Sequence, residues 1–369
     1  MRIEQIQLRQ IRMPLIEPFE TSFGRITVKH QIVVKAWSEG LVGWGESPAL
    51  DGPLYCYETT ETCWHVQRDF LVPWVLGRDI DHPGELVRLF TPVRGHNIAK
   101  TGLEQACWDL LAKASGQPLS RFLGGTKDRI QSGGSIGILD SVEDLLTEIA
   151  SFLEQGYRRI KIKVKPGWDL DVVQKVREQF PELPLMLDAN SAYTLADTDL
   201  FKALDTYDLM MIEQPLGYDD IIDHAKLQSQ ISTPICLDES ITTPEHARWA
   251  IELGSCRVIN IKPPRVGGLY QARRVHDICQ EHDVPVWCGG MIESGIGMAH
   301  NVAIGSLPNF RLPDDTCPSK RLFAVDTVLP PWQMDSDGTI GVPTKPGIGV
   351  EVDEDLLEQI TVREKTFCA

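Results

Sequence analysis

Five short apolar runs in the second half of the chain end on ionisable residues at almost constant spacing. The runs are 159–163, 185–188, 209–213, 235–238 and 258–262. Buried parallel strands appear in a sequence as short, continuous apolar runs of this kind. The last residues are Lys163, Asp188, Glu213, Asp238 and Lys262, so subtraction of residue numbers gives gaps of 25, 25, 25 and 24. The pattern predicts five parallel strands at a regular repeat.

The segments between these runs carry helical patterns, as at 169–179 and 244–253. A strand followed by a helix is the repeating unit of a (β/α)8 barrel. Residues 132–138, 285–291 and 309–312 are candidates for the first, seventh and eighth strands. We therefore predict an α/β fold with a (β/α)8-type barrel. Its strand ends open onto one face, which brings the five ionisable residues together.

The pattern is different on either side of the expected barrel. Apolar residues alternate at Ile3, Ile6 and Leu8, which predicts strands, and residues 57–123 follow a helical pattern. Beyond residue 321 the chain is rich in proline and glycine, and we expect this tail to return to the N-terminal unit. The expected domains are an α+β unit at 1–125, the barrel at 126–320 and the returning segment at 321–369.

The charge balance excludes several classes of partner. The 369 residues include 36 Lys and Arg against 52 Asp and Glu, a formal net charge of 36 − 52 = −16. This charge repels phosphate backbones and anionic lipids, so we expect neither nucleic acid nor a membrane as partner. No apolar stretch reaches the roughly 18 residues of a membrane helix, and the first ten residues lack a signal-peptide core. We expect a cytoplasmic protein.

Asp188, Glu213 and Asp238 offer hard anionic oxygens from three adjacent strands. Such oxygens suit magnesium or manganese, and a cation would reduce their mutual repulsion. Zinc is disfavoured, because no Cys or His accompanies them and the nine cysteines include no CxxC pair. The odd number of cysteines also argues against a complete set of disulfides, so most are expected to be buried thiols.

Lys161 and Lys163 lie two residues apart on one predicted strand, so both side chains point to the same face. In a barrel that face is the interior. Burial and a neighbouring ammonium both lower the pKa of a lysine, and we expect such a pair to supply a neutral base. Lys262 ends the sixth strand, across the barrel from Lys163. A carboxylate substrate between the two lysines would lose a weakly acidic α-proton, which is the reaction class that we infer.

The strand ends carry a resemblance to a known family. They are similar to the enolase superfamily, muconate-lactonizing subgroup, and the match spans nearly the whole chain. The stretches concerned are KIK at 161–163, LDAN at 187–190, IEQP at 212–215, LDES at 237–240 and NIKPPRVGG at 260–268.

Within that subgroup the chain is most similar to the o-succinylbenzoate synthase and N-succinylamino acid racemase family. The stretches that carry this are 18–24, 95–104, 108–113, 289–297 and 307–316. The resemblance implies a capping domain made of the N-terminal region and the C-terminal tail, whose loops at 19–24 and 51–55 close over the substrate. It implies Mg²⁺, with Mn²⁺ as an alternative, on Asp188, Glu213 and Asp238. It also implies a homo-oligomer, because family members are commonly dimers or larger.

The same resemblance implies roles for further residues. Lys163 and Lys262 are the implied acid and base residues, supported by Lys161, Asn190 and Arg265. The implied substrate-binding residues are Phe19, Ser22, Phe23, Tyr55, Ser135, Gly290, Met291 and Ile292.

One position departs from the family pattern. Pro264 stands between Pro263 and Arg265 where a glycine is expected, so the local geometry of this loop is open. Arg265 resembles an arginine of members with racemase activity, and an ordinary surface arginine is the competing interpretation.

Other functions of the same superfamily would require different residues at some of these positions. An acid-sugar dehydratase places a histidine where this chain has Cys288, and a dipeptide epimerase shows an Asp-x-Asp pair where Asp314 and Asp315 are adjacent. A muconate cycloisomerase-like enzyme is a further alternative. A barrel kept only as a scaffold would be expected to lose some of the five ionisable residues, and all five are present.

The family's two activities begin with the same step, the removal of an α-proton from a succinyl-bearing carboxylate. The synthase dehydrates 2-succinyl-6-hydroxy-2,4-cyclohexadiene-1-carboxylate in menaquinone biosynthesis, for which one lysine serves as base and then as acid. Racemisation uses two lysines on opposite faces. The synthase reaction is our principal expectation, with racemase activity beside it, and a racemase alone is the main alternative.

Overall fold

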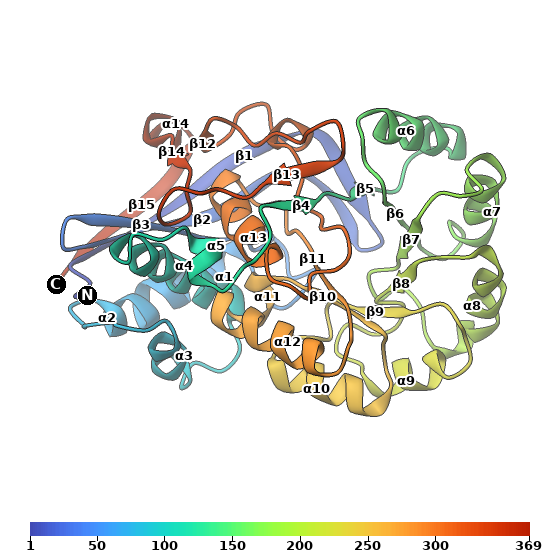
Figure 1. The fold of residues 1–369 in the computed structure, drawn as a ribbon, viewed down its shortest axis with the longest axis horizontal. Helices are drawn as coiled ribbons and strands as arrows, with labels where there is room; N and C mark the ends of the chain where they lie inside the picture. The colour runs from blue at the N-terminus through green and yellow to red at the C-terminus, as the bar shows by residue number, and fades with distance from the viewer.

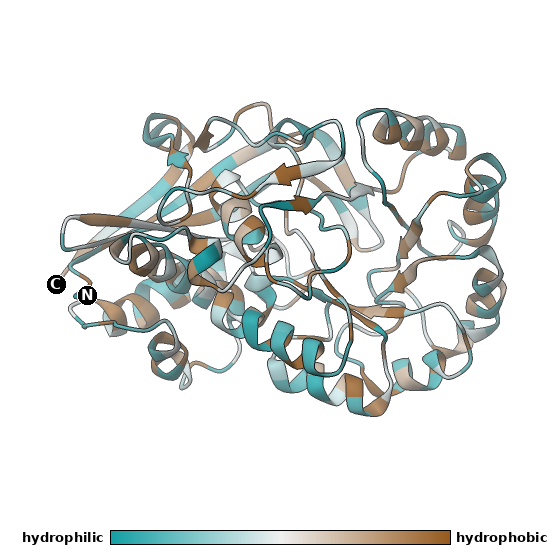
Figure 2. Cartoon of the chain, in the orientation of Figure 1, coloured by the Kyte–Doolittle hydropathy of each residue, from teal (hydrophilic) through white to brown (hydrophobic).

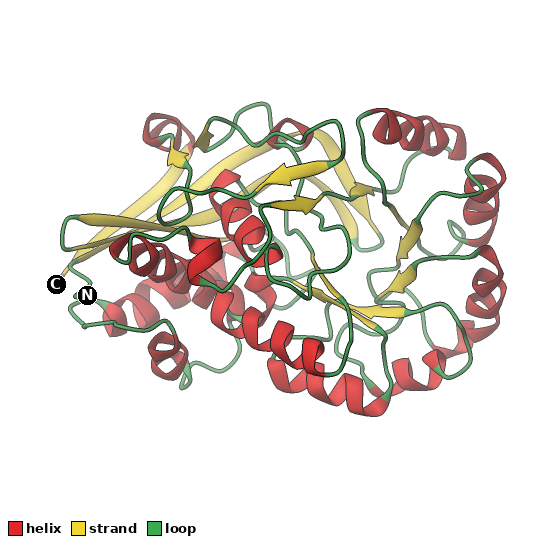
Figure 3. Cartoon of the chain, in the orientation of Figure 1, coloured by secondary structure: helices red, strands yellow, loops and turns green.

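The computed structural model describes residues 1–369. Figure 1 shows two parts: an antiparallel sheet with the blue and teal helices, which holds both termini, and a curled row of short strands ringed by helices. In Figure 3 these short strands, in yellow, lie inside an arc of red helices. The observed fold is therefore α/β, with an N-terminal capping region beside a curled parallel sheet.

The capping region is built on a four-stranded antiparallel sheet in the order β15-β1-β2-β3. Its strands are β1 (Gln5–Thr21), β2 (Gly24–Ser38), β3 (Leu41–Ser47) and β15 (Thr361–Cys368). The alternation of buried and partly buried residues at the start of β1 is the pattern of a sheet with one face packed on a core. Gln5 pairs with Cys368, so the last strand of the chain lies against its first.

A long buried helix, α4 (Asn97–Ala114), packs directly on β3. Two glycines of β3 permit this approach. A Cβ atom on Gly43 would lie 2.2 Å from the carbonyl oxygen of Ala106, and one on Gly45 would lie 2.1 Å from that of Gly102. The other helical elements of this region are α1 (Thr60–Val66), the π-helical turn Gln67–Leu71, α2 (Val72–Val75), α3 (Gly84–Phe90) and α5 (Leu119–Phe122).

The parallel sheet has seven strands in the order β11-β10-β9-β8-β7-β6-β5. Its strands are β5 (Gly134–Ile136), β6 (Ile160–Lys163), β7 (Leu185–Asp188), β8 (Met211–Glu213), β9 (Ile235–Leu237), β10 (Val258–Ile261) and β11 (Val286–Cys288). The five apolar runs of the sequence correspond to β6 to β10. Because neighbouring strands are in register, Lys163 lies beside Asp188 and Asp188 beside Glu213.

Helices cover the outer face of this sheet. In Figure 2 the outer helix α12 is mostly teal, whereas the short strands are mostly brown, as expected for a buried parallel sheet. The helices are α6 (Val142–Glu154), α7 (Leu170–Gln179), α8 (Thr198–Leu204), α9 (Ile222–Gln228), α10 (Pro244–Leu253), α11 (Pro263–Val266), α12 (Leu269–Glu281) and α13 (Gly295–Gly305), with 3-10 turns at Leu195–Asp197, Asp205–Tyr207 and Ser319–Arg321.

The eighth strand expected at 309–312 does not form, and that prediction is wrong. Within this segment only Phe310 makes a bridge, a parallel one to Val286, and Asp314 just beyond it makes another to Ser132. Pro308 and Pro313 flank it, and proline has no amide hydrogen to give to a ladder. The sheet is therefore a curled seven-stranded one whose two edges are linked by an irregular segment.

The rest of the tail forms short elements that pair with earlier or neighbouring segments. β13 (Thr339–Gly341) pairs with β4 (Arg129–Gln131), β12 (Val328–Leu329) pairs with β14 (Glu351–Val352), and α14 (Glu354–Ile360) precedes β15. All nine cysteines are free, and seven of them are buried, as the sequence indicated. None of the helices combines the length and the apolar character needed to cross a lipid bilayer.

Candidate active site

Three lysines lie among the three predicted carboxylates at the strand ends. All six side chains are buried. From lysine Nζ to carboxylate oxygen, the contacts are Lys163 to Asp188 at 2.5 Å, Lys161 to Glu213 at 3.1 Å and Lys262 to Asp238 at 2.7 Å. The period-two alternation of β6 places Lys161 and Lys163 on the inner face, as predicted. The residues that the sequence pattern grouped are thus close together.

Neutral side chains complete the contacts of this cluster. Asn190 accepts a hydrogen bond from Lys163 at 2.8 Å and donates one to Glu239 at 3.1 Å. Asn260 donates to Glu213 at 2.7 Å. These amides hold the charged groups in place through hydrogen bonds that are themselves buried.

The charge state predicted for the lysines is wrong for Lys161. Burial by itself lowers the pKa of its amine, but Asp315, Glu213 and Asp188 together raise that pKa above its ordinary value. Asp315 accepts a hydrogen bond from Lys161 at 2.5 Å. The pKa of Lys262 is also raised, because Tyr55 and the surrounding carboxylates outweigh burial. Lys161 is therefore a fixed positive charge beside Lys163 rather than a neutral amine.

The three carboxylates suit a hard divalent cation by their chemistry. Burial, followed by the charge of Asp188, raises the pKa of Glu213, so the carboxylates repel one another. Glu239 Oε2 is buried without a hydrogen-bond partner. In the present arrangement each predicted ligand contacts a lysine, and no three Asp, Glu, His or Cys side chains come close enough together to hold an ion. The metal site therefore stays a prediction.

Each catalytic lysine predicted from the sequence is covered by an aromatic ring of the capping region. The Nζ atom of Lys163 lies 5.9 Å from the centre of the Phe19 ring, and that of Lys262 lies 4.7 Å from the Tyr55 ring. Tyr55 also donates a hydrogen bond to Asp238 at 2.9 Å. Burial raises the pKa of Tyr55 to about 12, so this hydroxyl remains a donor. The two rings limit the access of water to both amines.

Arg265 is buried and is not a surface residue. The segment Pro263–Val266 forms the one-turn helix α11, which directs Arg265 inward. Its guanidinium donates to Asp238 and to the carbonyl oxygens of Asn260 and Ile241. Pro264 fits this turn because proline is well tolerated in the first turn of a helix. Arg265 thus neutralises the carboxylate that also contacts Lys262.

Two adjoining cavities open beside the lysines, and Lys163 and Lys262 line both of them. The larger, of about 100 Å³, is also lined by the predicted residues Phe19, Ser135, Gly290 and Ile292. The smaller, of about 70 Å³, is apolar and is lined by the predicted residues Phe19, Phe23, Tyr55, Asn190, Gly290, Met291 and Ile292. Ser22 lines neither cavity. Instead, its hydroxyl donates to the carbonyl oxygen of Asn190 at 3.1 Å and ties the capping hairpin to the sheet.

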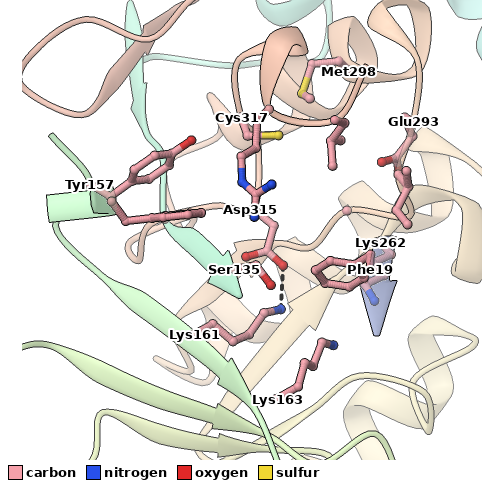
Figure 4. Close-up of a pocket in the computed structure, with 16 residues that line it drawn as sticks. Phe19, Ser135, Tyr157, Lys161, Lys163, Lys262, Glu293, Met298, Asp315 and Cys317 are labelled. Atoms are coloured by element: carbon pink, nitrogen blue, oxygen red, sulfur yellow. Dashed lines mark hydrogen bonds and ion pairs between the residues drawn. The ribbon is translucent and has the colours of Figure 1, made fainter. Parts of the chain in front are cut away.

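Several residues of the site were missed in the sequence analysis. Asn260 lies two residues before Lys262, so the alternation that placed Lys161 inward also applies to it. Glu239 directly follows Asp238 in the sequence. Figure 4 shows Tyr157 and Cys317 on one side of Asp315, with Lys161 and Lys163 on the other. No local pattern identifies Tyr157 or Cys317, because the fold alone brings them to the cavity.

The capping region, the curled sheet and the strand-end lysines and carboxylates together define a class of enzyme fold. The family model described as Enolase C-terminal domain-like matches residues 144–356. The model of the mandelate racemase / muconate lactonizing enzyme N-terminal domain matches residues 3–124. The chain belongs to this family of the enolase superfamily, and the resemblance seen in its sequence is confirmed.

Several individual proteins are similar to this chain over nearly its whole length. The chain is 52% identical to the o-succinylbenzoate synthase of Geobacillus kaustophilus, over 99% of this chain and 97% of that protein. It is 46% identical to the N-succinylamino acid racemase of Thermus thermophilus, over the full length of both. A solved enolase-superfamily structure from Listeria innocua superposes with a TM-score of 0.96 at 40% identity, and 99% of each chain is covered.

One solved structure of the same fold contains magnesium. It is a dipeptide epimerase from Cytophaga hutchinsonii in complex with Mg and the dipeptide D-Ala-L-Val. Its TM-score is 0.92 at 24% identity, and 99% of this chain and 100% of that chain are covered. At this identity the likeness shows a common fold.

Proposed function

We propose that the chain is an o-succinylbenzoate synthase of menaquinone biosynthesis that dehydrates 2-succinyl-6-hydroxy-2,4-cyclohexadiene-1-carboxylate. One observation carries the proposal: Lys163 and Lys262, from separate strands, line one cavity whose neighbouring strand ends bear three carboxylates. Relatives at 52% and 47% identity over 99% of this chain carry the synthase name.

In the proposed reaction Lys163, as the neutral amine, takes the proton from the carbon next to the ring carboxylate. The electron pair of that C–H bond forms the new ring double bond, and the C–O bond to the hydroxyl breaks. The same Nζ returns the proton to the departing hydroxide, which leaves as water, and the ring becomes aromatic. Lys161 stays protonated and Asn190 orients Lys163, since it accepts a hydrogen bond from the Lys163 amine.

We assign Asp188, Glu213 and Asp238 as the residues that would hold Mg²⁺, with Mn²⁺ as an alternative. When bound, the cation supplies positive charge that stabilises the substrate carboxylate as the α-proton leaves. Lys262 keeps a positive charge on the side of the cavity away from Lys163. Arg265 supports Lys262 through their shared partner Asp238.

N-succinylamino acid racemase activity is the second function that we propose. Both lysines line the same cavities, so each can exchange a proton with one face of an α-carbon between them. A dipeptide epimerase is less well supported. Asp315 is engaged by Lys161 and Arg159, and Asp314 accepts a hydrogen bond from the amide of Cys288, so neither is free to bind a substrate amine.

The remaining assignments follow from this proposal. We propose capping-domain residues 1–125, barrel residues 126–320 and a returning segment 321–369, with the irregular segment at 310–314 in the eighth position of a (β/α)8-type barrel. The substrate is a small carboxylate, and nucleic acid and membrane are not partners because of the net charge of −16. A cytoplasmic homo-oligomer is the proposed working form.

The decisive experiment is an assay of the purified protein with both substrates. We expect dehydration of 2-succinyl-6-hydroxy-2,4-cyclohexadiene-1-carboxylate, followed by the absorbance of the aromatic product, and slower racemisation of an N-succinylamino acid, followed by optical rotation. Racemisation without dehydration would replace the first proposal by the second. Absence of both reactions in the presence of Mg²⁺ would overturn both.

A further inference from the structure

The larger cavity continues past Lys161 and Asp315 to an end that the proposed chemistry does not use. Tyr157, Cys317 and Arg321 line this end. Tyr157 is only 1% exposed, and its hydroxyl has no hydrogen-bond partner. A buried hydroxyl without a partner is costly, and a ligand that accepts its hydrogen bond would remove that cost.

Arg321 provides a cation at the same end. Its guanidinium carbon lies 4.9 Å from the centre of the Phe152 ring, and the Phe152 and Tyr157 rings are 4.8 Å apart. The contact with the Phe152 ring holds the guanidinium at this end of the cavity. Its side chain makes no hydrogen bond within the protein, and the one ion pair, to Glu148, is long at 3.6 Å. Arg321 therefore keeps forked donors that no hydrogen bond within the protein uses.

The other charges around the cavity leave this end positive. Asp315 is neutralised by Lys161 at 2.5 Å and by Arg159 at 3.0 Å. Glu293, the remaining acidic residue of the lining, appears in Figure 4 on the opposite side of the cavity from Tyr157. An anion at this end thus meets a hydroxyl without a hydrogen-bond partner and a guanidinium whose one carboxylate partner, Glu148, lies 3.6 Å away.

We propose that Arg321 and Tyr157 bind the distal carboxylate of the succinyl group, and that this contact selects succinyl substrates over shorter acyl ones. The inference rests on the proposed function, since it assigns one part of the same substrate. Arg321 would pair with both oxygens of a carboxylate, an arrangement suited to its planar fork. Tyr157 would donate one further hydrogen bond. The reacting α-carbon then lies toward Lys163 and Lys262, at the other end of the cavity.

Arg321→Met is the main test, because it keeps much of the side-chain volume and removes the charge. We expect the ratio of kcat/KM for an N-succinylamino acid to that for the matching N-acetylamino acid to fall about 10- to 100-fold. Most of the change should be in KM. Arg158→Met is the matched control, because Arg158 is exposed and lies outside the cavity lining. An unchanged ratio in Arg321→Met would overturn the inference.

A binding measurement separates this inference from the proposed function. Wild-type protein with Mg²⁺ is titrated calorimetrically with 2-succinylbenzoate and with 2-butanoylbenzoate, which has a methyl group in place of the distal carboxylate. We expect Arg321→Met to weaken the first ligand about 10- to 100-fold more than the second. Equal weakening of both ligands would overturn the inference while turnover by the wild type still supported the function. Selective weakening in a protein without either activity would support the binding site alone.

Tyr157→Phe keeps the test decisive if Arg321→Met does not fold. The phenyl ring preserves the packing on Phe152 and removes only the hydroxyl. We expect a selective loss of about 10-fold in affinity for 2-succinylbenzoate, the size of one hydrogen bond to a charged group. No loss in a folded Tyr157→Phe protein would exclude the hydroxyl from the site and overturn the pairwise assignment.

Discussion

Lys163 and Lys262 line the same cavity although Lys163 ends β6 and Lys262 directly follows β10, four strands away in the sheet. Each donates a hydrogen bond to a carboxylate of an adjacent strand, and each is covered by an aromatic ring of the capping region. The curl of the sheet and the capping loops together therefore bring the two amines to one cavity.

Lys163→Ala should abolish dehydration and racemisation alike. The side chain is the proposed base for elimination and one of two bases for racemisation. We expect a loss of at least about 10²- to 10⁴-fold in kcat, as is usual when a general base is removed. Both reactions are measured on folded protein, checked by its unfolding temperature. Dehydration at the wild-type rate by this variant would show that the base lies elsewhere.

Removal of divalent cations should stop turnover. Asp188, Glu213 and Asp238 are the residues that would hold the cation, which would relieve their mutual repulsion and stabilise the substrate carboxylate. Dialysis against EDTA should eliminate dehydration, and Mg²⁺ or Mn²⁺ should restore it. As a control, the dialysed protein should keep its circular dichroism spectrum. Full activity in protein shown to be metal-free would refute the assignment of these three residues.

Stability should depend on pH through Glu104, which joins the capping region to the barrel. Its carboxylate accepts hydrogen bonds from the amides of Leu269 and Tyr270 at the start of α12 and from the indole of Trp108. Burial raises the pKa of Glu104 from 4.5 to about 7. Between these values the unfolded chain binds fewer protons than the folded one, so stability falls as pH rises. The full effect above pH 7 is about 3 kcal/mol.

The measurement is urea unfolding of the wild type and of Glu104→Gln between pH 5 and pH 8. The glutamine has no titrating proton to lose, so the variant should show a shallower decline over this range than the wild type. Burial also raises the pKa of Glu46 to about 7. Part of the decline in stability should therefore remain in both proteins. Identical pH profiles would mean that Glu104 does not titrate in this range.

The inward positions of the lysines could be predicted from the sequence because the alternation of a strand is local. Lys161 and Lys163 share a face for that reason, and the same rule, applied to Asn260 and Lys262, also places Asn260 inward. The rule fails at 309–312, where two flanking prolines prevent a continuous ladder. Periodicity therefore predicts where a side chain points, provided that the strand exists.

The charge states and the far end of the cavity could not be predicted in this way. The pKa of Lys161 is raised by Asp315, which is 154 residues away in the sequence and reaches the site through an irregular segment. Arg265 lies inside the protein because two prolines begin a single helical turn. The sequence by itself did not predict the geometry of this loop. The charge of Lys161 and the burial of Arg265 both depend on contacts between distant segments, which a local sequence pattern cannot predict.

The roles of the two lysines can be separated with Lys262→Arg. Arginine keeps a positive charge next to Asp238 but stays protonated, so it cannot serve as a base. In D₂O the variant should exchange the α-proton of the enantiomer that faces Lys163, while exchange of the other enantiomer and net racemisation fail. Proton NMR of each pure N-succinylamino acid enantiomer measures the exchange, and chiral chromatography measures the racemisation.

This test requires that the wild type first be shown to exchange both enantiomers. Lys163→Arg is the matched variant, and it should give the mirror-image result, with exchange only of the enantiomer that faces Lys262. Such a reversal has no explanation in a general loss of structure, because each variant keeps one half-reaction that the other loses. Equal exchange of both enantiomers by Lys262→Arg would show that Lys262 is not the second base. Racemisation would then need another group, and the proposal of two lysines on opposite faces of the substrate would have to be abandoned.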